Sequence, residues 1–274
     1  MKIIRTQEEI NRIMSRVGND AHFENALIKN VEITPVRGYF TFKNVIFYNC
    51  FIGVREKKFD SECVSIRLKG HNEIIKCEGK SADFSVLQYG ESAFKDSVIK
   101  SVRSSAYASI LVNSCDVEDF YFGNAPQATY LIVNNDIGDI VTQLSSIKGN
   151  GIIYDSNNIS KIAYWATDKG TSYISSAHRR TIERLLQNNN IGQFLFRGHL
   201  SYEDLSGLDF GNIKISEVEF NQCIMDGVDM SGVDIGESFI IFNDTDISNV
   251  KFGKRHVIDE ISREGNLYKR VWQR

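Results

Sequence analysis

The sequence predicts an all-β solenoid, a coil of short strands stacked turn upon turn, and three observations support this fold class. The first is a run of hydrophobic residues spaced five apart between Leu200 and Phe252. The second is a set of similar four-residue phrases that recur every 18 to 22 residues in the first half. The third is continuity, since the 274 residues contain only two prolines and no glycine- or serine-rich linker. We therefore expect one elongated domain with helical ends.

The five-residue period is the strongest of these signals. A helix of 3.6 residues per turn would spread such a period around its whole surface, and a strand would place alternate members on opposite faces. A solenoid whose sides are five residues long would instead aim every member inward. The register contains Leu200, Leu205, Phe210, Ile215, Phe220, Met225, Met230, Ile235 and Ile240, and after a shift of two residues Phe242, Ile247 and Phe252. Positions two residues earlier are mostly small or aliphatic: Leu208, Ile213, Val218, Cys223, Val228, Val233, Ser238, Thr245 and Val250.

Short polar segments separate the large residues, such as Asp204-Leu-Ser-Gly, Asp229-Met-Ser-Gly and Asp246-Ile-Ser-Asn. These segments resemble the A(D/N)LXX pattern of the pentapeptide-repeat family. The resemblance implies a right-handed parallel β-helix of quadrilateral section, with pentapeptide-repeat coils over residues 191–252. Val, Ile and Leu often stand where that family has Ala, Ser or Cys, which indicates a wider or less regular coil.

Residues 1–22 are predicted to form an N-terminal helical cap. Thr6 and Glu9 have the spacing of a capping box, and the apolar residues from Ile10 to Val17 fall on one face of a helix. A solenoid end exposes unpaired backbone and an open apolar stack, so a helix laid across it is the expected cap.

Residues 23–174 are predicted to form irregular β-helix rungs. The recurring phrases begin at Ile99, Val117, Ile137 and Ile159, which is the rung length of a parallel β-helix with variable corner loops. A β-sandwich is the alternative for so many short strands, but the even repeat favours the solenoid.

Residues 175–190 are predicted to interrupt the rungs with an inserted helix. His178, Ile182, Leu185 and Leu186 share one face of this helix, and the sequence from Asn188 to Asn190 ends it. Arg179, Arg180 and Arg184 lie elsewhere on its surface, where they either remain solvated or read an anion.

Residues 253–274 are predicted to form a mainly helical tail, with Gly265 as a break. Leu267, Tyr268, Val271 and Trp272 form an apolar cluster in this tail. The cluster either closes the last coil or forms a dimer contact, as in pentapeptide-repeat proteins that pair through C-terminal helices. Tyr268 and Trp272 are the candidate residues for a partner or homodimer contact.

Composition predicts a cytoplasmic protein without a cofactor or metal. The N-terminus carries no signal-like apolar run, and no stretch is long and apolar enough to span a membrane. The five cysteines, Cys50, Cys63, Cys77, Cys115 and Cys223, lack the paired short spacings of zinc or redox motifs, so we expect buried, reduced thiols. The five histidines are also scattered, and no phosphate loop, nucleophile elbow or HExxH motif occurs. No catalytic residue is proposed.

Negative charge is concentrated in the pentad region. Between Leu200 and Phe252, eleven acidic residues face only Lys214 and Lys251. Acidic residues just before inward positions should form ladders on the outer faces, and they either bind a partner or only keep the surface soluble. The candidate binding surface consists of Asp204, Asp209, Glu219, Asp229, Asp234 and Asp246.

The expected function is non-catalytic binding of another macromolecule, most simply a protein, through a rigid surface; direct nucleic-acid binding and a membrane role are not expected. One alternative, implied by the resemblance, is an acidic DNA mimic that occupies the basic cleft of a topoisomerase-type target. Another is a β-helical bacterial effector domain or a polysaccharide-acting enzyme.

Overall fold

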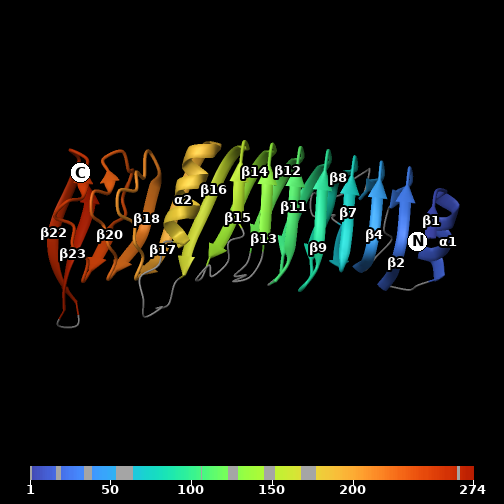
Figure 1. Ribbon diagram of the computed structural model, residues 1–274, viewed down its shortest axis with the longest axis horizontal. Coiled ribbons are helices and arrows are strands. Elements are labelled where there is room, and N and C mark those ends of the chain that lie inside the picture. Colours follow the sequence, from blue (N-terminus) through green and yellow to red (C-terminus); the bar gives the residue numbers. More distant parts are fainter. Residues whose placement is uncertain are drawn as a thin grey trace. The chain divides into compact units, whose positions relative to one another are not determined.

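The computed structural model describes residues 2–16, 20–33, 39–53, 64–105, 107–122, 129–144, 152–167, 177–263 and 266–274. The chain forms a β-solenoid of about 10 turns, which confirms the predicted fold class (Figure 1). It divides into two compact units. Unit 1 comprises residues 1–140 and 149–158, and unit 2 comprises residues 141–148 and 159–274.

Unit 1 consists of one helix and a succession of parallel strands. Its elements are β1 (Lys2–Ile4), α1 (Gln7–Arg16), β2 (Asp20–Lys29), β3 (Glu32–Ile33), β4 (Tyr39–Tyr48), β5 (Phe51–Ile52), β6 (Val64–Lys69), β7 (His71–Ile75), β8 (Glu78–Val86), β9 (Glu91–Lys95), β10 (Val98–Ser104), β11 (Ser109–Asn113), β12 (Asp116–Phe122), β13 (Thr129–Val133), most of β14 (Asp136–Leu144) and β15 (Ile152–Asp155). Ile99 lies opposite Val117 and Val102 opposite Phe120 in adjacent turns. The predicted repeat of the four-residue phrases is therefore a true turn-to-turn register at this point.

Each turn of unit 1 contains one corner of the same construction. A mostly short and polar residue adopts a left-handed conformation, with φ between 49° and 56°, at positions 30, 49, 76, 96, 114, 134 and 156. The next residue points inward, and these residues are Val31, Cys50, Cys77, Ser97, Cys115, Asn135 and Asn157. Their side chains bond along the stack: the Asn135 Oδ1 atom accepts the Cys115 N–H at 2.9 Å, and the Asn157 Oδ1 atom accepts the Asn135 N–H at 3.0 Å. This ladder satisfies backbone groups where the chain turns away from the strands.

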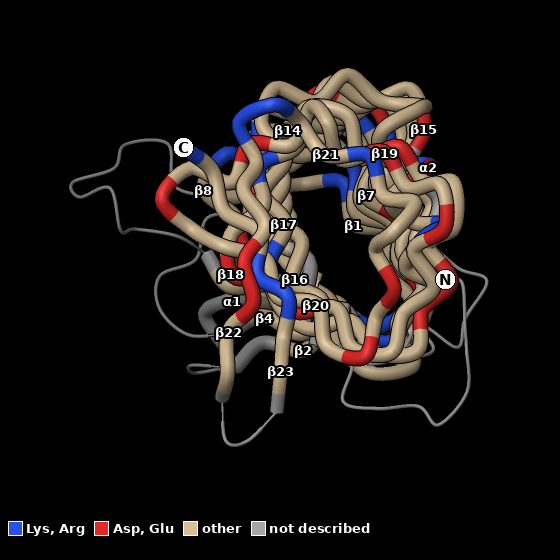
Figure 2. Tube along the Cα trace, turned by 90° about the vertical axis from the view of Figure 1, so that its left-hand side faces the viewer, with Lys and Arg blue, Asp and Glu red and all other residues tan. Residues whose placement is uncertain are grey.

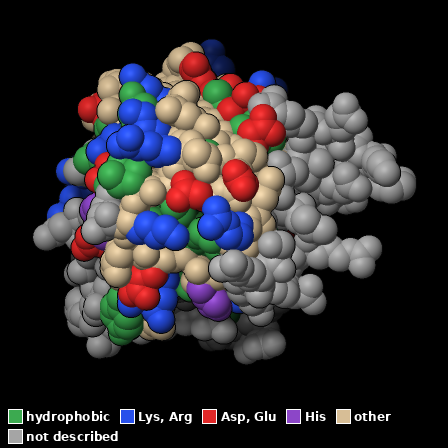
Figure 3. Space-filling model, turned by 90° about the vertical axis from the view of Figure 1, so that its right-hand side faces the viewer, with side chains coloured by type: hydrophobic (Ala, Val, Ile, Leu, Met, Phe, Trp, Pro, Cys, Tyr) green, Lys and Arg blue, Asp and Glu red, His purple; other side chains and the backbone are tan. Residues whose placement is uncertain are grey.

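The N-terminal helix forms as predicted. The Thr6 hydroxyl accepts the Glu9 N–H at 3.3 Å, which confirms the N-cap half of the capping box, while the Glu9 carboxylate accepts the Arg5 N–H at 3.2 Å. The Gln7 carboxamide then bonds both the N–H and the C=O of Glu32, each at 2.7 Å. A helix side chain thus occupies a strand's free edge, as expected of a cap; Figure 3 shows that this end carries cationic, acidic and apolar side chains intermixed.

Unit 2 contains the regular pentads. Its elements are β16 (Asn158–Thr167, from Ile159), α2 (Ala177–Asn188), β17 (Asn190–Ser201), β18 (Lys214–Asn221), β19 (Asp229–Met230), β20 (Ile240–Asn243), β21 (Lys251–Phe252), β22 (His256–Arg263) and β23 (Asn266–Gln273). All nine members of the first register, from Leu200 to Ile240, are at most 1% exposed. Leu200 lies opposite Phe220, and Phe220 lies opposite Phe242 with rings stacked at 5.3 Å. The five-residue inward register and its two-residue shift are confirmed.

Helix α2 also forms as predicted and ends at Asn188. His178, Ile182 and Leu185 are fully buried, and the Tyr164 hydroxyl lies 2.6 Å from the His178 Nδ1 atom. Arg180 and Arg184 are exposed. The helix therefore supplies core side chains in unit 2 where a strand would otherwise do so.

The helical prediction for residues 253–274 is wrong. This segment forms an antiparallel hairpin, in which β22 pairs with β23 over all eight residues and β23 pairs with β20 through Ile240 and Val271 (Figures 1 and 2). The free edge of β20 is a strong template for a further strand, and this tertiary pairing overrides the helical spacing of Leu267, Tyr268, Val271 and Trp272. Gly265, expected to break a helix, lies outside the described residues.

Candidate functional site

The acidic residues of the pentad coils make local turns. In each of five aspartates, one carboxylate oxygen accepts the backbone N–H of the residue two positions later, at 2.7 to 3.1 Å. This is the hydrogen bond of an Asx-turn, which lets a short side chain replace a backbone acceptor. The five residues are Asp204, Asp209, Asp229, Asp234 and Asp246.

The same aspartates lie on different sides of the coil. Asp209 and Asp229 lie opposite each other in adjacent turns, so one step of the predicted acidic ladder is present. The next residue in that column is Lys251, whose Nζ atom lies 2.6 Å from the Asp229 carboxylate. On another side, Asp234 lies opposite Lys214. The columns thus combine acids with lysines.

Glu219 occupies a further side, where the His199 Nδ1 atom lies 3.2 Å from its carboxylate. Asp204 lies opposite Ile224, a 42% exposed side chain. Figure 2 shows the acidic positions distributed around the coil at this end of the chain. The predicted acidic surface is therefore divided into separate columns.

Hydrogen bonding lowers the pKa of three of these carboxyl groups. The Lys251 ammonium is the main cause at Asp229, whose pKa falls to about 2. The Ser206 hydroxyl lowers the pKa of Asp204, and the Ser248 backbone N–H lowers the pKa of Asp246. Asp204 and Asp246 are thus stabilised as anions by the turns in which they lie, and Asp229 is stabilised first by Lys251 and then by its turn.

A row of large side chains crosses an outer face of unit 2. Trp165 on β16 is 43% exposed, and the Arg197 guanidinium carbon on β17 lies 5.9 Å from the centre of its ring. On β18, a bulge between the pairs Phe196–Ile215 and Gly198–Val218 places both Ser216 and Glu217 opposite Arg197.

The row continues toward the C-terminus. Phe239, which is 40% exposed, immediately precedes Ile240, the partner of Val218, so it lies beside Glu217. Continuing the antiparallel register of Ile240 and Val271 by one residue places Trp272 beside Phe239. We call Trp165, Arg197, Glu217, Phe239 and Trp272 the aromatic stripe.

The structure places the two candidate contact residues of the C-terminal segment on β23. Tyr268 lies opposite Ile261 and Trp272 opposite Val257, with Arg270 between them on the same face of the strand. Arg270 forms a two-pronged ion pair with Asp259, at 3.0 and 2.5 Å. Trp272 thus belongs to the aromatic stripe, whereas Tyr268 lies farther along the hairpin.

The sequence reasoning missed Trp165, Arg197 and Phe239. Trp165 stands between the inward residues Tyr164 and Ala166, and Phe239 stands just before the inward residue Ile240. A large aromatic residue at an outward position of a strand was the available signal.

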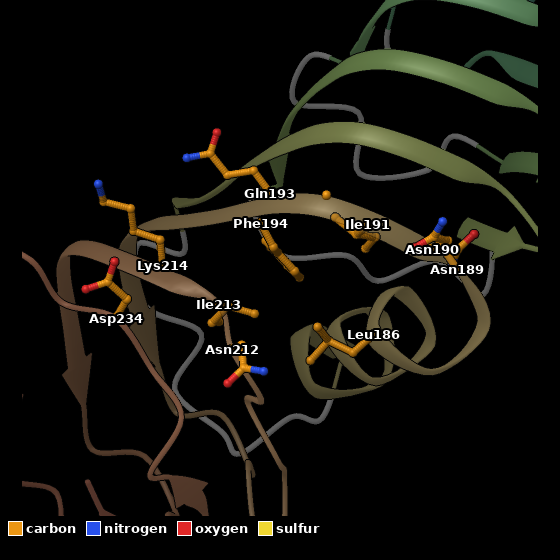
Figure 4. Close-up of a pocket in the computed structure, with 11 residues that line it drawn as sticks. Leu186, Asn189, Asn190, Ile191, Gln193, Phe194, Asn212, Ile213, Lys214 and Asp234 are labelled. Carbon is orange, nitrogen blue, oxygen red and sulfur yellow. The ribbon is translucent and has the colours of Figure 1, made fainter. Parts of the chain in front are cut away.

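A cavity of about 540 Å³ lies beside the C-terminal end of α2, within unit 2 (Figure 4). Leu186, Ile191, Phe194 and Ile213 supply its apolar wall. Its polar wall consists of Asn189, Asn190, Gln193, Asn212, Lys214 and Asp234. The side chains of Phe194, Ile213 and Leu186 converge in Figure 4, whereas Gln193 and Lys214 extend toward its rim.

Nucleophilic and titratable groups remain scattered. Within the described parts of the chain, no three His, Cys, Asp or Glu side chains form a cluster that could hold a metal ion. Cys50, Cys77 and Cys115 are buried at the corners of unit 1, and His178 is buried under α2, where burial lowers its pKa to about 4. Cys63 lies outside the described residues. No described helix is long and apolar enough to cross a membrane.

Comparison of the chain with protein-family models, curated proteins and solved structures gave no match in any of the three.

Proposed function

We propose that this chain is a non-catalytic β-solenoid that binds another protein, and that the aromatic stripe of unit 2 forms the contact. The observation that supports this proposal most directly is the contact of Arg197 with the exposed Trp165 ring, together with the strand register that, extended by one residue to Phe239, continues the row to Trp272. Tryptophan, tyrosine and arginine supply most of the binding free energy at protein interfaces. Parallel stacking holds their backbones in fixed positions, which lowers the entropy lost on binding.

Arg197 adds polar specificity to this stripe. Its Nε atom is buried and has no hydrogen-bond partner among the described residues. An unpaired buried donor costs about 1–3 kcal/mol. A carbonyl or carboxylate oxygen of a bound protein would reach this atom only if the Arg197 side chain shifted to expose it, and the new hydrogen bond would then regain the free energy lost in the isolated chain.

The second candidate function is an acidic mimic of nucleic acid that occupies a basic cleft, as in a topoisomerase. The excess of eleven acidic residues over two lysines in residues 200–252 favours it. Three features weaken it: the acids occupy separate columns, Lys251 pairs with Asp229, and five of the carboxylates make Asx-turns. We propose that these acids keep the surface soluble and shape the turns.

We further propose that residues 191–252 are diverged pentapeptide-repeat coils. The buried five-residue register and the repeated Asp-x-Ser turns support this relationship. Turns of about four pentads, as between Leu200 and Phe220, agree with a four-sided coil.

Differential capture from a lysate of the source cells tests the proposal. The parent protein is compared with the Trp165→Ala/Phe239→Ala double variant and with Tyr89→Ala, a control that removes a 71% exposed aromatic ring from unit 1. A partner that binds the stripe is retained by the parent and by Tyr89→Ala but lost by the double variant, with little dependence on salt. Equal capture by all three proteins, with release of the partner at high salt, would contradict the proposal and support the acidic mimic.

A further inference from the structure

Strand β22 is the outermost strand at the C-terminal end of unit 2. It pairs with β23 on one side, and its other side has no strand partner among the described residues (Figure 1). We infer that this free edge binds an extended segment of a protein partner by adding it to the sheet as a further strand. The inference rests on the proposed function in one respect, that the partner is a protein, and it names the mode of binding.

The hydrogen-bond pattern shows which backbone groups are available. The Arg274 N–H donates to the Arg255 C=O at 3.0 Å, so this pair and every second pair after it bond across the hairpin. Val257, Asp259 and Ile261 therefore direct their N–H and C=O groups toward β23. The residues that alternate with them, Ile258, Glu260 and Ser262, direct their N–H and C=O groups toward the free edge.

The edge strand includes the charged residues Asp259, Glu260 and Arg263 but lacks two other features by which proteins block strand addition, proline and bulges. Residues 256–263 contain no proline and no lysine, and all eight pairs with β23 follow one register without a bulge. At the first strands of unit 1, by contrast, the Gln7 side chain bonds both backbone groups of Glu32. An edge is thus covered by a side chain there, whereas the edge of β22 remains a template for pairing.

The charges along β22 indicate what kind of strand would pair with it. The Asp259 carboxylate is already paired with Arg270. Glu260 is exposed, and within the described structure it forms no ion pair with Lys269, the residue opposite it on β23. Ile258, two residues away on the same face, is 49% exposed. An incoming strand with a lysine or arginine opposite Glu260 and an apolar residue opposite Ile258 would complement both.

A second copy of the chain fits this edge less well. Two antiparallel self-pairings of equal length join outward-facing backbone groups: one centred on Glu260 places two Glu260 side chains directly opposite each other, and one centred on Asp259 does the same with two Asp259 side chains. Like charges in that position are destabilising. We therefore infer that the occupant is a segment of another protein that carries both basic and apolar residues, and that it is not a second copy of this chain.

Hydrogen exchange of the full chain with two synthetic peptides tests the inference. One peptide carries valine and lysine in turn along a single face, with threonine between them on the other face (Val-Thr-Lys-Thr-Val-Thr-Lys), and the second peptide has glutamate in place of lysine. The lysine peptide should slow exchange of the Ile258, Glu260 and Ser262 amides by about tenfold or more. The glutamate peptide should not, and the Val257, Asp259 and Ile261 amides, already bonded to β23, should change little with either.

Two substitutions at one position sharpen the test. Glu260→Lys should reverse the preference between the peptides, and Glu260→Pro should abolish protection by removing an edge donor without breaking a bond to β23. No protection by either peptide, or unchanged protection in Glu260→Pro, would overturn the inference. So would a dimer in light scattering with the three edge amides already protected. Trp165→Ala should leave peptide protection intact, so a failure of the edge and a failure of the stripe give different results.

Discussion

The corners of unit 1 depend on side chains that point inward, whereas most turns of the pentad coils depend on aspartates that fold back onto their own backbone. In unit 1, Asn135 and Asn157 bond the buried backbone of the preceding turn. In unit 2, one corner of each turn keeps that construction, with the Thr245 hydroxyl accepting the Cys223 N–H at 3.2 Å, and the Asx-turns supply most of the other corners.

This difference accounts for part of the uneven charge of the chain. A neutral amide inside the solenoid adds no charge, but an aspartate at each outer turn adds a negative charge for every few residues of coil. Five of the eleven acidic residues between 200 and 252 are turn acceptors, so a large part of the acidic composition is weak evidence for a basic partner. The surface that we propose for binding depends on a different feature, the aromatic stripe.

The largest effect on stability is expected from a substitution in the inward aromatic stack, because both units depend on this interaction. Phe220 is fully buried and contacts the rings of Phe196, Phe210 and Phe242. Phe220→Asp should cost several kcal/mol, because an unpaired carboxylate would replace a core ring. Urea unfolding measures the loss, and the exposed neighbour Phe239→Asp should change stability by much less. Equal losses would show that the inward register is incorrect.

A large pH-dependent effect is expected at His178. Burial lowers its folded pKa from 6.5 to about 4, so the unfolded chain binds a proton in this window and the folded chain does not. Stability should be greatest above pH 6.5 and should decline as the pH falls toward 4, by on the order of 3 kcal/mol at most. The decline should be smaller in His178→Leu, measured as the pH dependence of the urea midpoint. The same decline in both proteins would assign it to other groups.

The two kinds of corner should differ in what they tolerate. Asn135→Ala leaves the buried Cys115 N–H without its acceptor and should cost about 1–3 kcal/mol. Asp229→Ala removes an exposed turn acceptor and an ion pair, and it should cost less, about 0.5–2 kcal/mol by analogy with helix caps. Glu237→Ala, an exposed acid in the same coils, is the matched control. A larger loss in Asp229→Ala than in Asn135→Ala would reverse the comparison.

The smallest effect is expected from the charge of Asp229 in acid. Its folded pKa of about 2 lies below the usual value of 3.8, mainly because of Lys251. The stabilisation that the ionised Asp229 carboxylate contributes to the folded state should therefore be complete above about pH 4, and it should disappear as the pH falls through 2. Parent and Asp229→Asn should differ slightly in stability at neutral pH and converge in strong acid. A difference that persists at low pH would exclude the carboxylate as its source.

Sequence reasoning predicted the features that repeat. The inward register from Leu200 to Phe252, the rung spacing from Ile99 to Val117 and the Thr6 cap each depend on local spacing, which a single sequence displays. The C-terminal hairpin was missed because Leu267, Tyr268, Val271 and Trp272 also fit a helical period. Only the free edge of β20, a tertiary feature, decides between the two. The two residues that separate β22 from β23 were the available signal for a hairpin.

The candidate site was harder to predict for a related reason. The sequence displays the aspartates, but their turn hydrogen bonds and their distribution over separate columns depend on the length of each turn. The aromatic stripe joins residues from Trp165 to Trp272 that are far apart along the chain. Their alignment requires the turn-to-turn register and a bulge between Phe196 and Gly198, neither of which a spacing argument supplies.

The most direct test of the claim that the aspartates are turn acceptors compares two sets of five substitutions at Asp204, Asp209, Asp229, Asp234 and Asp246. Asparagine keeps the oxygen that accepts the turn N–H and removes the charge, whereas alanine removes both. We expect the asparagine set to unfold in urea close to the parent and to retain the partner, and the alanine set to unfold at a clearly lower urea concentration. Equal destabilisation of the two sets, or loss of the partner in the asparagine set, would contradict the claim. Either result would indicate that the negative charge itself is needed for stability or for binding.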